Sequence, residues 1–579
     1  MNTPSKIDDF TTPRGLRKAL LRRHYALKSE RSSWDTHWSE ISRVLLPRNY
    51  RTLSTDRNRT GRSYYNRIYD NTGTKALRVM AAGMMAGASS PGRPWFKLTT
   101  LDPELRKFKP IRDWLNQIED QMQMVMARSN LYRTMHQTYE DMGAFGTGAF
   151  QLRADDRNLI HAYPAVVGSY SLASNWKGEV VSFYREFERT VGEVVREFGL
   201  DACSDSTRQA YKNHDLENEV KILHVIEPRA TQKGDPSKPL LAREMPYRST
   251  YVELNAEDDR VLRDSGFMTF PVVSPRWAVT PDNVYGHSPG MEALGDMRQL
   301  QQEQLRKGQA IDYAVHPPLQ VPTALKDRES EMFPGGVTYY EPGTMIPFDQ
   351  ATPAGGIRTA YEVSLDMRPL LEDIQDVRER IRSSFFADLF LMLSMAGTNT
   401  RMTATEVAER HEEKLLMLGP TLERVHTEML KPVIDLTFDY MLQAGMVEPP
   451  PPELQGTELD VEFVSILAQA QKAIGITAVD RFVGNALGIA QSVPEVLDNI
   501  NFDEWANVYA QKLGVDSSLL VDPRMRDRMR QARAQAESAQ AQVQMQREQA
   551  AAVKDMANAP TSGANALSDV MRTLTEPPA

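Results

Sequence analysis

The chain has very little cysteine. Cys203 is its only cysteine in 579 residues, which excludes a disulfide within the chain and is typical of a reducing compartment. The first ten residues lack the apolar core of a secretion signal. The most apolar runs, at residues 79–88 and 385–396, are much shorter than the roughly 20 residues that cross a bilayer. We therefore expect a soluble protein made in the cytoplasm, with no membrane partner.

Motifs for nucleotide chemistry are also missing. The nearest approach to a phosphate-binding loop, residues 87–92, is followed by Arg93 and Pro94, and it lacks the lysine and the hydroxyl that such a loop needs. The glycines of residues 143–148 lead into a strand pattern, where a dinucleotide-binding motif requires a helix. We interpret the first segment as a helix exit and the second as a tight turn, and we expect no cofactor.

Metal-binding spacings are absent in the same way. His411-Glu-Glu-Lys begins like a zinc-protease motif, but Leu415 occupies the position of the second ligand. The paired aspartates at 155–156 and 258–259 lie in polar, turn-like sequence, so we interpret them as solvated loop carboxylates rather than a metal pair. Catalytic triads are assembled in space and leave no such spacing. These absences therefore argue most strongly against a nucleotide-driven motor, and we expect a protein that is not an enzyme.

Positive charge is in the minority. The chain has 68 Lys and Arg against 77 Asp and Glu, a net charge of −9, which argues against tight non-specific binding to a phosphate backbone. Basic residues nevertheless cluster near both ends, and a solvated helix face is the plainer interpretation, with phosphate contact as the alternative. The two clusters are Arg14, Arg17, Lys18, Arg22 and Arg23, and Arg524, Arg526, Arg528, Arg530 and Arg533.

The first half of the chain predicts an α+β fold that is mainly helical. Helical spacing is present at residues 34–45, 77–85, 111–125 and 131–142, with Asp70 as N-cap of the second helix and Gly83 allowing a close neighbour. A strand is expected from Trp95. Strand patterns then dominate residues 149–273, interrupted by one helix with Thr190 and Glu193 in capping-box register.

The second half is organised around residues 361–442, which predict a long helix, a small-residue loop at 393–402 and a second helix that is kinked or broken at Gly419-Pro420 and Pro432. Before it, a polar helix at 291–314 is followed by a turn-rich insert with strand-forming residues. Residues 448–452 read as a stiff proline linker, 461–505 as helical and 523–556 as one long helix.

Several stretches, in this order, resemble the head-to-tail connector, or portal, proteins of short-tailed bacteriophages. The resemblance covers roughly residues 30–450. It rests on Trp38, Ile41 and Pro47; Tyr69 to Thr74; Ala81 to Gly87; Pro94 to Leu98; Gly143 to Phe150; Tyr285 to Gly290; Ser384 to Phe390; Thr403 to Val407; Leu418 to Pro420; and Glu428 to Pro432.

The resemblance implies a portal fold assembled as a ring, a homododecamer, at one capsid vertex of the virion. It divides the chain into parts with named roles. These are a wing at 1–284, a first stem helix at 285–315, a clip at 316–356, a second stem helix at 357–391, a tunnel loop at 392–403, a long kinked wing or crown helix at 404–448, a crown at 449–522, and, at 523–579, a C-terminal helix that is a candidate for a barrel, with a disordered tail.

The resemblance also implies sites and partners. The partners are double-stranded DNA, the terminase large subunit, a tail adaptor or gatekeeper protein, and the major capsid and scaffold proteins, in a particle made in the host bacterial cytoplasm. The expected tunnel-loop residues are Ser394, Gly397, Thr398, Asn399 and Arg401. The expected channel-facing stem residues are Arg306, Lys307, Arg378 and Arg382, and the expected clip residues are Pro318, Pro334, Gly335, Tyr339 and Pro342.

Two other classes of function remain open at this point. A DNA-packaging enzyme of the terminase type would hydrolyse ATP, and the missing phosphate-binding loop counts against it. A monomeric nucleic-acid-binding adaptor would form no ring and would bind DNA with strong salt dependence. Ring formation therefore separates the first hypothesis from both.

Overall fold

The computed structural model describes residues 13–47, 68–100, 102, 105, 108–229, 241–315, 319–322, 345–348, 358–359, 367–395, 417–454, 459–464, 476–490, 493, 495, 500–503, 505–506 and 523–557. The chain divides into two compact units, Met1–Ile474 and Gly475–Ala579. Within the described ranges, every helix is too short or too polar to cross a membrane. The mixture of helices and strands agrees with the expected α+β class.

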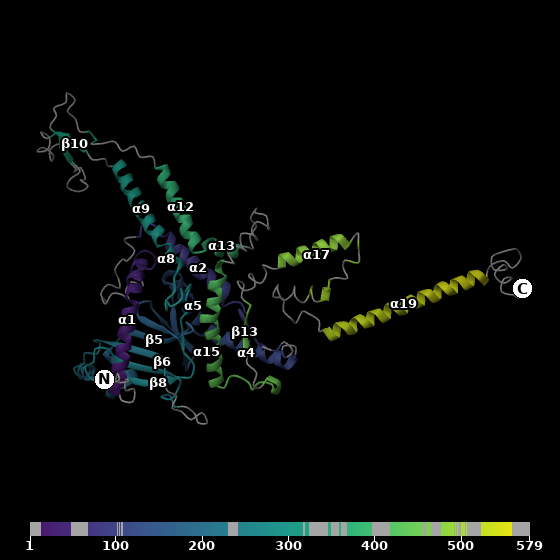
Figure 1. Ribbon diagram of the computed structural model, residues 1–579, viewed down its shortest axis with the longest axis horizontal. Coiled ribbons are helices and arrows are strands. Elements are labelled where there is room, and N and C mark those ends of the chain that lie inside the picture. Colours follow the sequence, from purple (N-terminus) through teal and green to yellow (C-terminus); the bar gives the residue numbers. More distant parts are fainter. Residues whose placement is uncertain are drawn as a thin grey trace, which may run out of the picture. The chain divides into compact units, whose positions relative to one another are not determined.

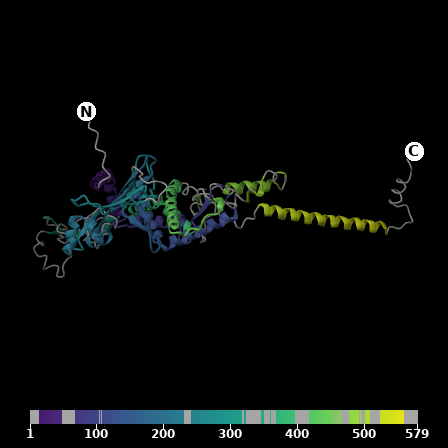
Figure 2. The same ribbon diagram turned by 90° about the horizontal axis from the view of Figure 1, so that it is seen from below.

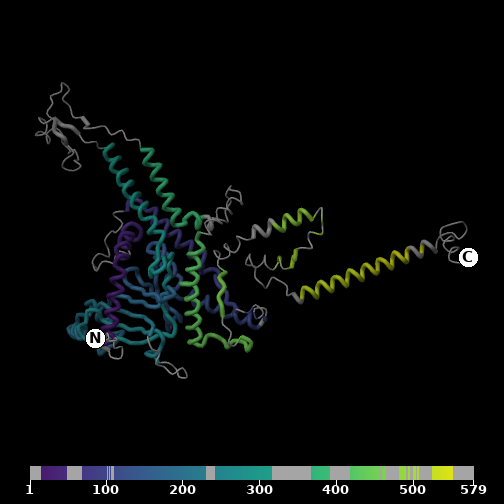
Figure 3. Tube along the Cα trace, in the orientation of Figure 1, coloured from purple at the N-terminus to yellow at the C-terminus, as the bar shows by residue number. Residues whose placement is uncertain are grey.

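An antiparallel five-stranded sheet forms the β-rich part of the first unit. Its strand order is β4-β5-β6-β7-β8. The 32-residue helix α1, Pro13–Val44, packs on one face of this sheet through Leu16 and Leu20 (Figure 3). The strands are β4 Tyr170–Ser174, β5 Val180–Thr190, β6 Glu219–Pro228, β7 Tyr247–Glu253 and β8 Arg263–Phe267.

Two arginines of the first basic cluster contact this sheet, while Lys18, Arg22 and Arg23 are exposed, as the solvated interpretation expects. Arg17 is buried and donates to the backbone carbonyls of Glu253 and Ala256. Arg23 Nη1 lies 2.8 Å from Glu227 Oε2 on β6. The solvated interpretation is therefore wrong for Arg17, whose acceptors on and just beyond β7 lie more than 200 positions away in sequence. Arg23 is exposed, although it also has an acceptor on the sheet.

A second, three-stranded sheet with order β3-β2-β9 joins the first sheet to the helices. Its strands are β2 Ala149–Asp155, β3 Leu159–Ala165 and β9 Val272–Val273. Two helices, α4 Lys109–Arg128 and α5 Leu131–Phe145, precede it, as expected. Gly146 ends α5 with φ +79°, and an added Cβ would lie 2.0 Å from Gly286 O, so the glycine-rich tight turn is confirmed.

Helix α2, Thr72–Ala88, lies in the middle of the main apolar core. Asn71 is its N-cap, one residue after the expected Asp70, but the Asp70 carboxylate still accepts from the first helical N–H, that of Thr72, at 2.8 Å. Gly83 is covered by the ring of Phe390, whose nearest atoms would be 2.3 Å from an added Cβ. The expected close approach at Gly83 is thus confirmed.

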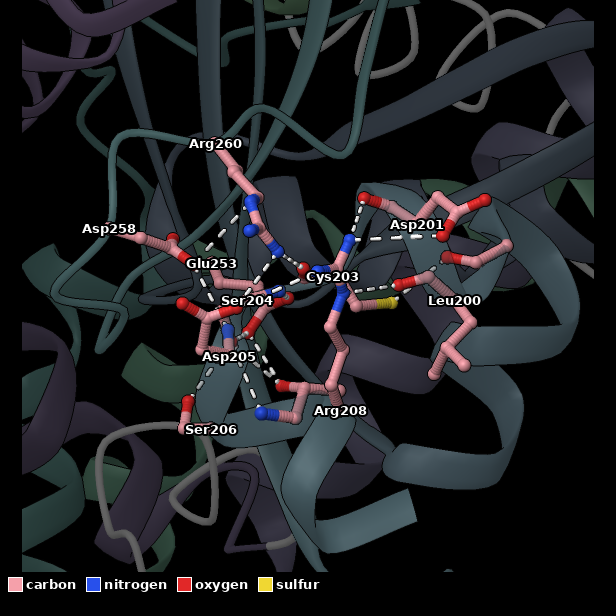
Figure 4. Close-up of polar contacts among 12 residues, drawn as sticks. Leu200, Asp201, Cys203, Ser204, Asp205, Ser206, Arg208, Glu253, Asp258 and Arg260 are labelled. Atoms are coloured by element: carbon pink, nitrogen blue, oxygen red, sulfur yellow. Dashed lines mark hydrogen bonds and ion pairs between the residues drawn. The ribbon is translucent and has the colours of Figure 1, made fainter. Parts of the chain in front are cut away.

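The helix between the strands begins as the sequence predicts. Helix α6, Val191–Phe198, has the Thr190–Glu193 capping box, and α7, Asp205–Lys212, begins at Ser204. Figure 4 shows how buried Glu253 on β7 holds this region: it accepts from Ser204 N at 2.8 Å and from Ser204 Oγ at 2.6 Å. Burial first, and then the Glu253 charge, raise the pKa of the buried Cys203 thiol to about 11, so this cysteine is held in its unreactive protonated form.

The two aspartate pairs differ from one another. Asp155 is the last residue of β2, and its carboxylate accepts from Asn158 N in the following turn at 2.9 Å, as a loop carboxylate does. Asp258 is instead a structural acceptor that binds Asp205 N at 3.0 Å (Figure 4), so the solvated interpretation is wrong for it. No cluster of three or more ligating side chains occurs among the described residues.

A two-stranded sheet connects distant parts of the chain. Strand β1, Phe96–Thr100, begins where the sequence indicates, and it pairs antiparallel with β13, Leu459–Phe463. The helical prediction for 461–505 is therefore wrong at its start, because Val461 to Phe463 extend a sheet. The preceding proline segment is fixed as well: Trp114 Nε1 donates to Glu448 O at 3.1 Å, and Leu454 is buried.

The second helix, expected to be kinked or broken, is unbroken over its described residues. Residues 417–443 are helical throughout, including Gly419-Pro420, and the irregularity is a π-helical turn, His426–Leu430, immediately before α15, Lys431–Gln443. Pro432 has no N–H to donate to the turn before it, which accounts for the wider turn at this place. Glu428 in the π turn binds buried Arg276 at two points, with Nη2–Oε1 2.7 Å and Nε–Oε2 3.1 Å.

The second unit contains α17, Ile476–Ala490, and α19, Pro523–Ala557. The predicted long C-terminal helix is confirmed, and it is straight in both orientations (Figure 2). In the second basic cluster, Arg530 forms a two-point pair with Asp503, with both distances 2.6 Å, and Arg526 lies 3.7 Å from the same carboxylate. Residues 558–579 lie outside the described residues.

Candidate functional site at the α9–α12 helix pair

Two helices run side by side and carry a small sheet at their far end (Figure 1). They are α9, Leu294–Val315, and α12, Arg368–Ser384. Between them in the sequence are strands β10 Leu319–Pro322, β11 Met345–Phe348 and β12 Arg358–Thr359, in sheet order β11-β10-β12. The predicted order of helix, strand-containing insert and helix is confirmed.

The start of each helix follows from local sequence. Ser288 caps the short helix α8, Pro289–Glu292, by accepting from Met291 N at 3.0 Å, and its hydroxyl donates to Ala144 O at 2.8 Å. Helix α12 has proline in its first turn, where the missing N–H costs no hydrogen bond. Leu300, Ile374 and Val377 are among the buried side chains between the two helices and the core.

A single aspartate connects both helices to the start of α2. Asp70 Oδ2 accepts from Arg378 of α12, at 3.0 Å from Nε and 2.7 Å from Nη2, and from Gln304 of α9 at 3.2 Å. The side chain of Gln301 on α9 binds the backbone of Asp70. Its Oε1 accepts from Asp70 N at 2.9 Å, and its Nε2 donates to Asp70 O at 2.8 Å. This Asp70 junction fixes where the helix pair leaves the core.

The electrostatics of the Asp70 junction favour the charged form of its carboxyl. Burial alone raises the pKa of Asp70, but hydrogen bonds from Thr72 and Arg378 outweigh it, so the pKa of Asp70 lies below its ordinary value. The side chain of Asp70 is only 6% exposed and that of Arg378 is 29% exposed. The pair is therefore an internal, largely desolvated contact.

Further polar contacts hold the helix pair, one between α9 and α12 and one between α9 and α1. Asp296 on α9 lies 3.3 Å from Arg380 Nε on α12, and Arg298 Nη2 lies 3.0 Å from Glu40 on α1. Glu303 is buried, and burial together with the Asp373 charge raises the pKa of its carboxyl. The helix pair is thus held by charges as well as by its apolar seam.

The four predicted stem residues fall into two groups. Arg378 is committed to Asp70. Arg306 and Arg382 are exposed and Lys307 is half-buried, and these three have no ion-pair partner in the described part of the chain. Their cationic groups are therefore available to bind a partner outside this chain.

The other predicted site residues lie at the edge of the structure or outside it. Ser394 belongs to the last turn of α13, Ala387–Met395. Gly397, Thr398, Asn399 and Arg401 of the expected tunnel loop lie outside the described residues, as do all five expected clip residues, Pro318, Pro334, Gly335, Tyr339 and Pro342.

The expected second stem helix at 357–391 is interrupted near its end, and at its start Arg358–Thr359 belong to strand β12. Helix α12 ends at Ser384, and Phe386 adopts φ +53°, a left-handed conformation that a phenylalanine rarely takes. Ile381, Phe385 and Leu389 have the spacing of one continuous helix, so the apolar periodicity does not indicate the break at Phe386. The turn lets α13 pack on α2, where Phe390 covers Gly83.

The sequence reasoning found Arg378 but missed its partners. Asp70 was interpreted only as a helix cap, and Gln301 and Gln304 were counted as part of a polar, glutamine-rich helix. One local signal was available: two glutamines three positions apart on a helix face the same way, which indicates a polar partner for that face.

Comparison with known proteins decides the family. Residues 17–521 match the family described as "Bacteriophage head to tail connecting protein". The chain is 50% identical over 556 residues to the "Probable portal protein" of Bordetella phage BPP-1, covering 96% of this chain and 98% of that protein. It belongs to the bacteriophage head-to-tail connecting proteins.

A second relative supports the same family. The "Portal protein" of Salmonella phage epsilon15 is 39% identical over 554 residues, covering 96% of this chain and 95% of that protein. The function of this connecting protein is accordingly that of a phage portal protein between head and tail, in a family whose role is structural.

Solved structures of gene transfer agent particles are more distant. A chain of the virion of the native particle is 12% identical with a TM-score of 0.33, covering 72% of this connecting protein and 86% of that chain. A chain of the neck of the empty particle is also 12% identical, with a TM-score of 0.35, covering 73% and 90%. Scores this low leave the assignment resting on the sequence relatives.

Proposed function

We propose that this connecting protein assembles as a dodecameric ring at one capsid vertex and encloses a channel for double-stranded DNA. The near full-length identity of 50% to a protein described as a probable portal protein carries this proposal. The α9–α12 pair supports it, because a chain that must extend to a peripheral module and return needs two adjacent helices with that module between them (Figure 1).

The parts of the ring subunit follow from this arrangement. In the proposal, α9 and α12 are the stem helices, residues 316–356 are the clip, and 392–403 are the tunnel loop. Residues 1–284 form the wing and 404–448 the long wing or crown helix. Residues 449–522 form the crown, and residues 523–579 form the C-terminal helix and tail. Strand β13, at the start of the crown range, pairs with β1 of the wing range.

The charge of the stem fits a conduit. A ring in which every subunit gripped several phosphates would hold DNA in place, because each neutralised phosphate adds to the binding free energy. In the described part of the stem, Arg306, Lys307 and Arg382 are the predicted cations left without an ion-pair partner, and Arg378 is neutralised by Asp70. The proposal therefore gives the channel a few weak contacts per subunit.

The partners of the ring follow from its position. The clip docks the terminase large subunit during packaging and a tail adaptor or gatekeeper protein afterwards. The wing contacts the major capsid and scaffold proteins. The ATPase that drives packaging belongs to the terminase, so the purified connecting protein is expected to hydrolyse no ATP.

The mass and shape of the purified protein test this proposal. We expect light scattering to give a mass of about a dozen subunits, and negative-stain microscopy to show rings with a central hole. Because such rings can need scaffold protein to form, the measurement is repeated after co-expression with scaffold. A monomer under both conditions would reject the proposed ring, and ATP hydrolysis by the protein would favour a packaging enzyme instead.

A further inference from the structure

A row of cationic and aromatic side chains crosses one face of the five-stranded sheet. Arg185 on β5 is paired with His224 on β6, His224 with Tyr251 on β7, and Tyr251 with Arg263 on β8. Residues directly opposite one another on neighbouring strands point to the same face. The face opposite α1 therefore carries arginine, histidine, tyrosine and arginine in one line.

The second sheet adds another arginine to this row. Arg153 on β2 donates from Nη1 to the Tyr251 hydroxyl at 3.2 Å. The Tyr251 and His224 rings are stacked, with centroids 3.9 Å apart and planes 4° from parallel. A hydroxyl that accepts from Arg153 keeps its own proton free to donate.

Aromatic rings hold the guanidinium groups in place. The Cζ of Arg153 lies 5.7 Å from the centre of the Tyr163 ring, that of Arg185 lies 5.5 Å from Phe187, and that of Arg263 lies 4.9 Å from Phe198. Such contacts fix the orientation of a guanidinium without using its N–H donors.

Most of the guanidinium donors in this row have no acceptor among the residues that the structure describes. Arg263 Nη2 donates to Glu197 O at 2.9 Å. The side chain of Arg185 donates no hydrogen bond to the described residues, and its Nε is buried. None of Arg153, Arg185 and Arg263 forms an ion pair with a carboxylate in the ranges that the structure describes.

The local charge is positive. Burial and then the charges of Arg153, Arg185 and Arg263 hold the pKa of His224 well below its ordinary value, so His224 is neutral and the three arginines supply the charge. Glu197 is the carboxylate whose charge acts on Tyr251, beside those of Arg153 and Arg263. The charges of all three arginines act on His224, so they lie near one another and repel, and a bound anion offsets that repulsion.

We propose that Arg153, Arg185 and the Tyr251 hydroxyl form a binding site for a small oxyanion of the phosphate class. Guanidinium groups bind phosphate oxygens through two parallel N–H donors, and a tetrahedral dianion accepts from several groups at once. All three arginines of the row are half-buried and Tyr251 is buried, so the site is open to solvent on its arginine side and shielded on its tyrosine side. The site is independent of the stem and of the proposed channel.

Calorimetric titration of the full-length protein with inorganic phosphate tests the proposal, with sodium chloride matched in ionic strength as the blank. We expect one saturable site per chain in the wild type. Binding is expected to weaken about tenfold or more in Arg185→Gln and in Arg153→Gln, because each removes a charge-assisted contact. Arg157→Gln is the matched control, since Arg157 is exposed in the adjacent β2–β3 turn and the substitution removes the same charge.

Thermal unfolding in chloride gives a second readout. If the arginines bind an anion, Arg185→Gln should leave the midpoint in chloride unchanged or raise it, because repulsion between the arginines is relieved. In phosphate, the same substitution should abolish the rise in midpoint that the wild type shows. A midpoint lowered by the same amount in both salts would show a purely structural arginine and overturn the proposal. Equal phosphate binding by wild type and Arg185→Gln, or no saturable binding by the wild type, would overturn it as well.

Discussion

Arg378 and Asp70 form a two-point ion pair across α12 and the start of α2, with Nε and Nη2 at 3.0 and 2.7 Å from the same oxygen, Oδ2. Replacing Arg378 by glutamine leaves a nearly buried carboxylate without its cation. We expect a loss of about 2 kcal/mol in the free energy of unfolding, below the usual cost for a fully buried pair because Arg378 is partly exposed. Chemical denaturation at constant protein concentration measures it.

The pH dependence of that loss provides its control. The pKa of Asp70 is lowered in the folded state, so its stabilisation is complete above the unfolded value of about 3.9 and disappears as the pH falls through the folded value. The difference between wild type and Arg378→Gln should therefore shrink below about pH 4. Exposed Arg382→Gln is expected to change stability by less than about 0.5 kcal/mol. An equal effect of both substitutions would contradict the role of the pair.

The buried carboxyl of Glu119 on α4 should make stability fall as the pH rises, opposite to the effect of Asp70. Burial raises the pKa of its carboxyl to about 7, although its Oε1 accepts from Leu98 N at 2.6 Å. Because the folded state binds this proton more tightly, stability is lost as the pH rises from about 4.5 through 7. We expect Glu119→Gln to be more stable than the wild type at pH 8, by on the order of 2–3 kcal/mol, and about equal to it at pH 5.

Thermal midpoints across this pH range check the prediction for Glu119. Asp113→Asn, an exposed carboxylate on the same helix, serves as the control and should show no such crossover. A stability difference for Glu119→Gln that stays constant from pH 5 to pH 8 would show that the Glu119 carboxyl does not titrate in this interval.

Two helical glycines should respond to alanine in opposite directions. An added Cβ at Gly83 would meet the Phe390 ring at 2.3 Å, so Gly83→Ala is expected to cost roughly 1–3 kcal/mol. At Gly308 in α9 no atom lies within 4 Å of such a Cβ among the described residues, so Gly308→Ala should gain about 0.5–1 kcal/mol through helix propensity. Midpoints of unfolding that move together would disprove the packing of α13 on α2.

The β1–β13 pairing predicts where the chain can be shortened. A chain ending at Ile474 keeps β13, whereas a chain ending at Leu454 removes it and uncovers an edge of β1 beside buried Trp95 and Phe96. We expect the first to unfold cooperatively near the wild-type temperature and the second to unfold earlier or aggregate. Equal thermal midpoints for the two chains would show that the pairing contributes nothing to stability.

The proposed tunnel loop can be tested by a deletion that also removes Leu393 to Met395 of α13, and by a substitution at Gly397 that leaves α13 complete. Deleting Leu393 to Arg401, or replacing Gly397, is expected to leave ring assembly intact and to reduce the packaged genome, because the segment would contact DNA rather than the subunit core. Ring yield by microscopy and genome content per particle measure the two effects separately. A normal genome content in the deletion mutant would reject the assignment.

Local signals in the sequence predicted much of the fold correctly. The Thr190–Glu193 capping box and the turn at Gly146 depend on residues within a few positions of each other, and both are confirmed. The order of helix, insert and helix also follows from local pattern, because prolines and glycines interrupt helical periodicity visibly. These features need no knowledge of distant contacts.

Contacts between distant residues could not be predicted in this way. Asp70 and Arg378 are 308 positions apart, and Arg17 reaches a carbonyl 236 positions away. Phe386 departs from the helix although its neighbours keep helical spacing, since the packing of α13 on α2 outweighs its own backbone preference. Residues 461–463 of β13 likewise form a strand because they pair with β1, which lies more than 300 positions earlier in the sequence.

The π-helical turn at His426–Leu430 determines the rotational phase of everything after it. One residue corresponds to about 100° of rotation in an α-helix. If the turn were regular, the face of α15 would therefore be displaced by about that angle. The bond from Tyr440 to Leu152 O, at 3.1 Å, and that from Thr269 to Asp439, at 2.9 Å, both depend on the present angle. The wider turn thus orients α15 so that Tyr440 contacts β2 and the neighbouring Asp439 contacts Thr269.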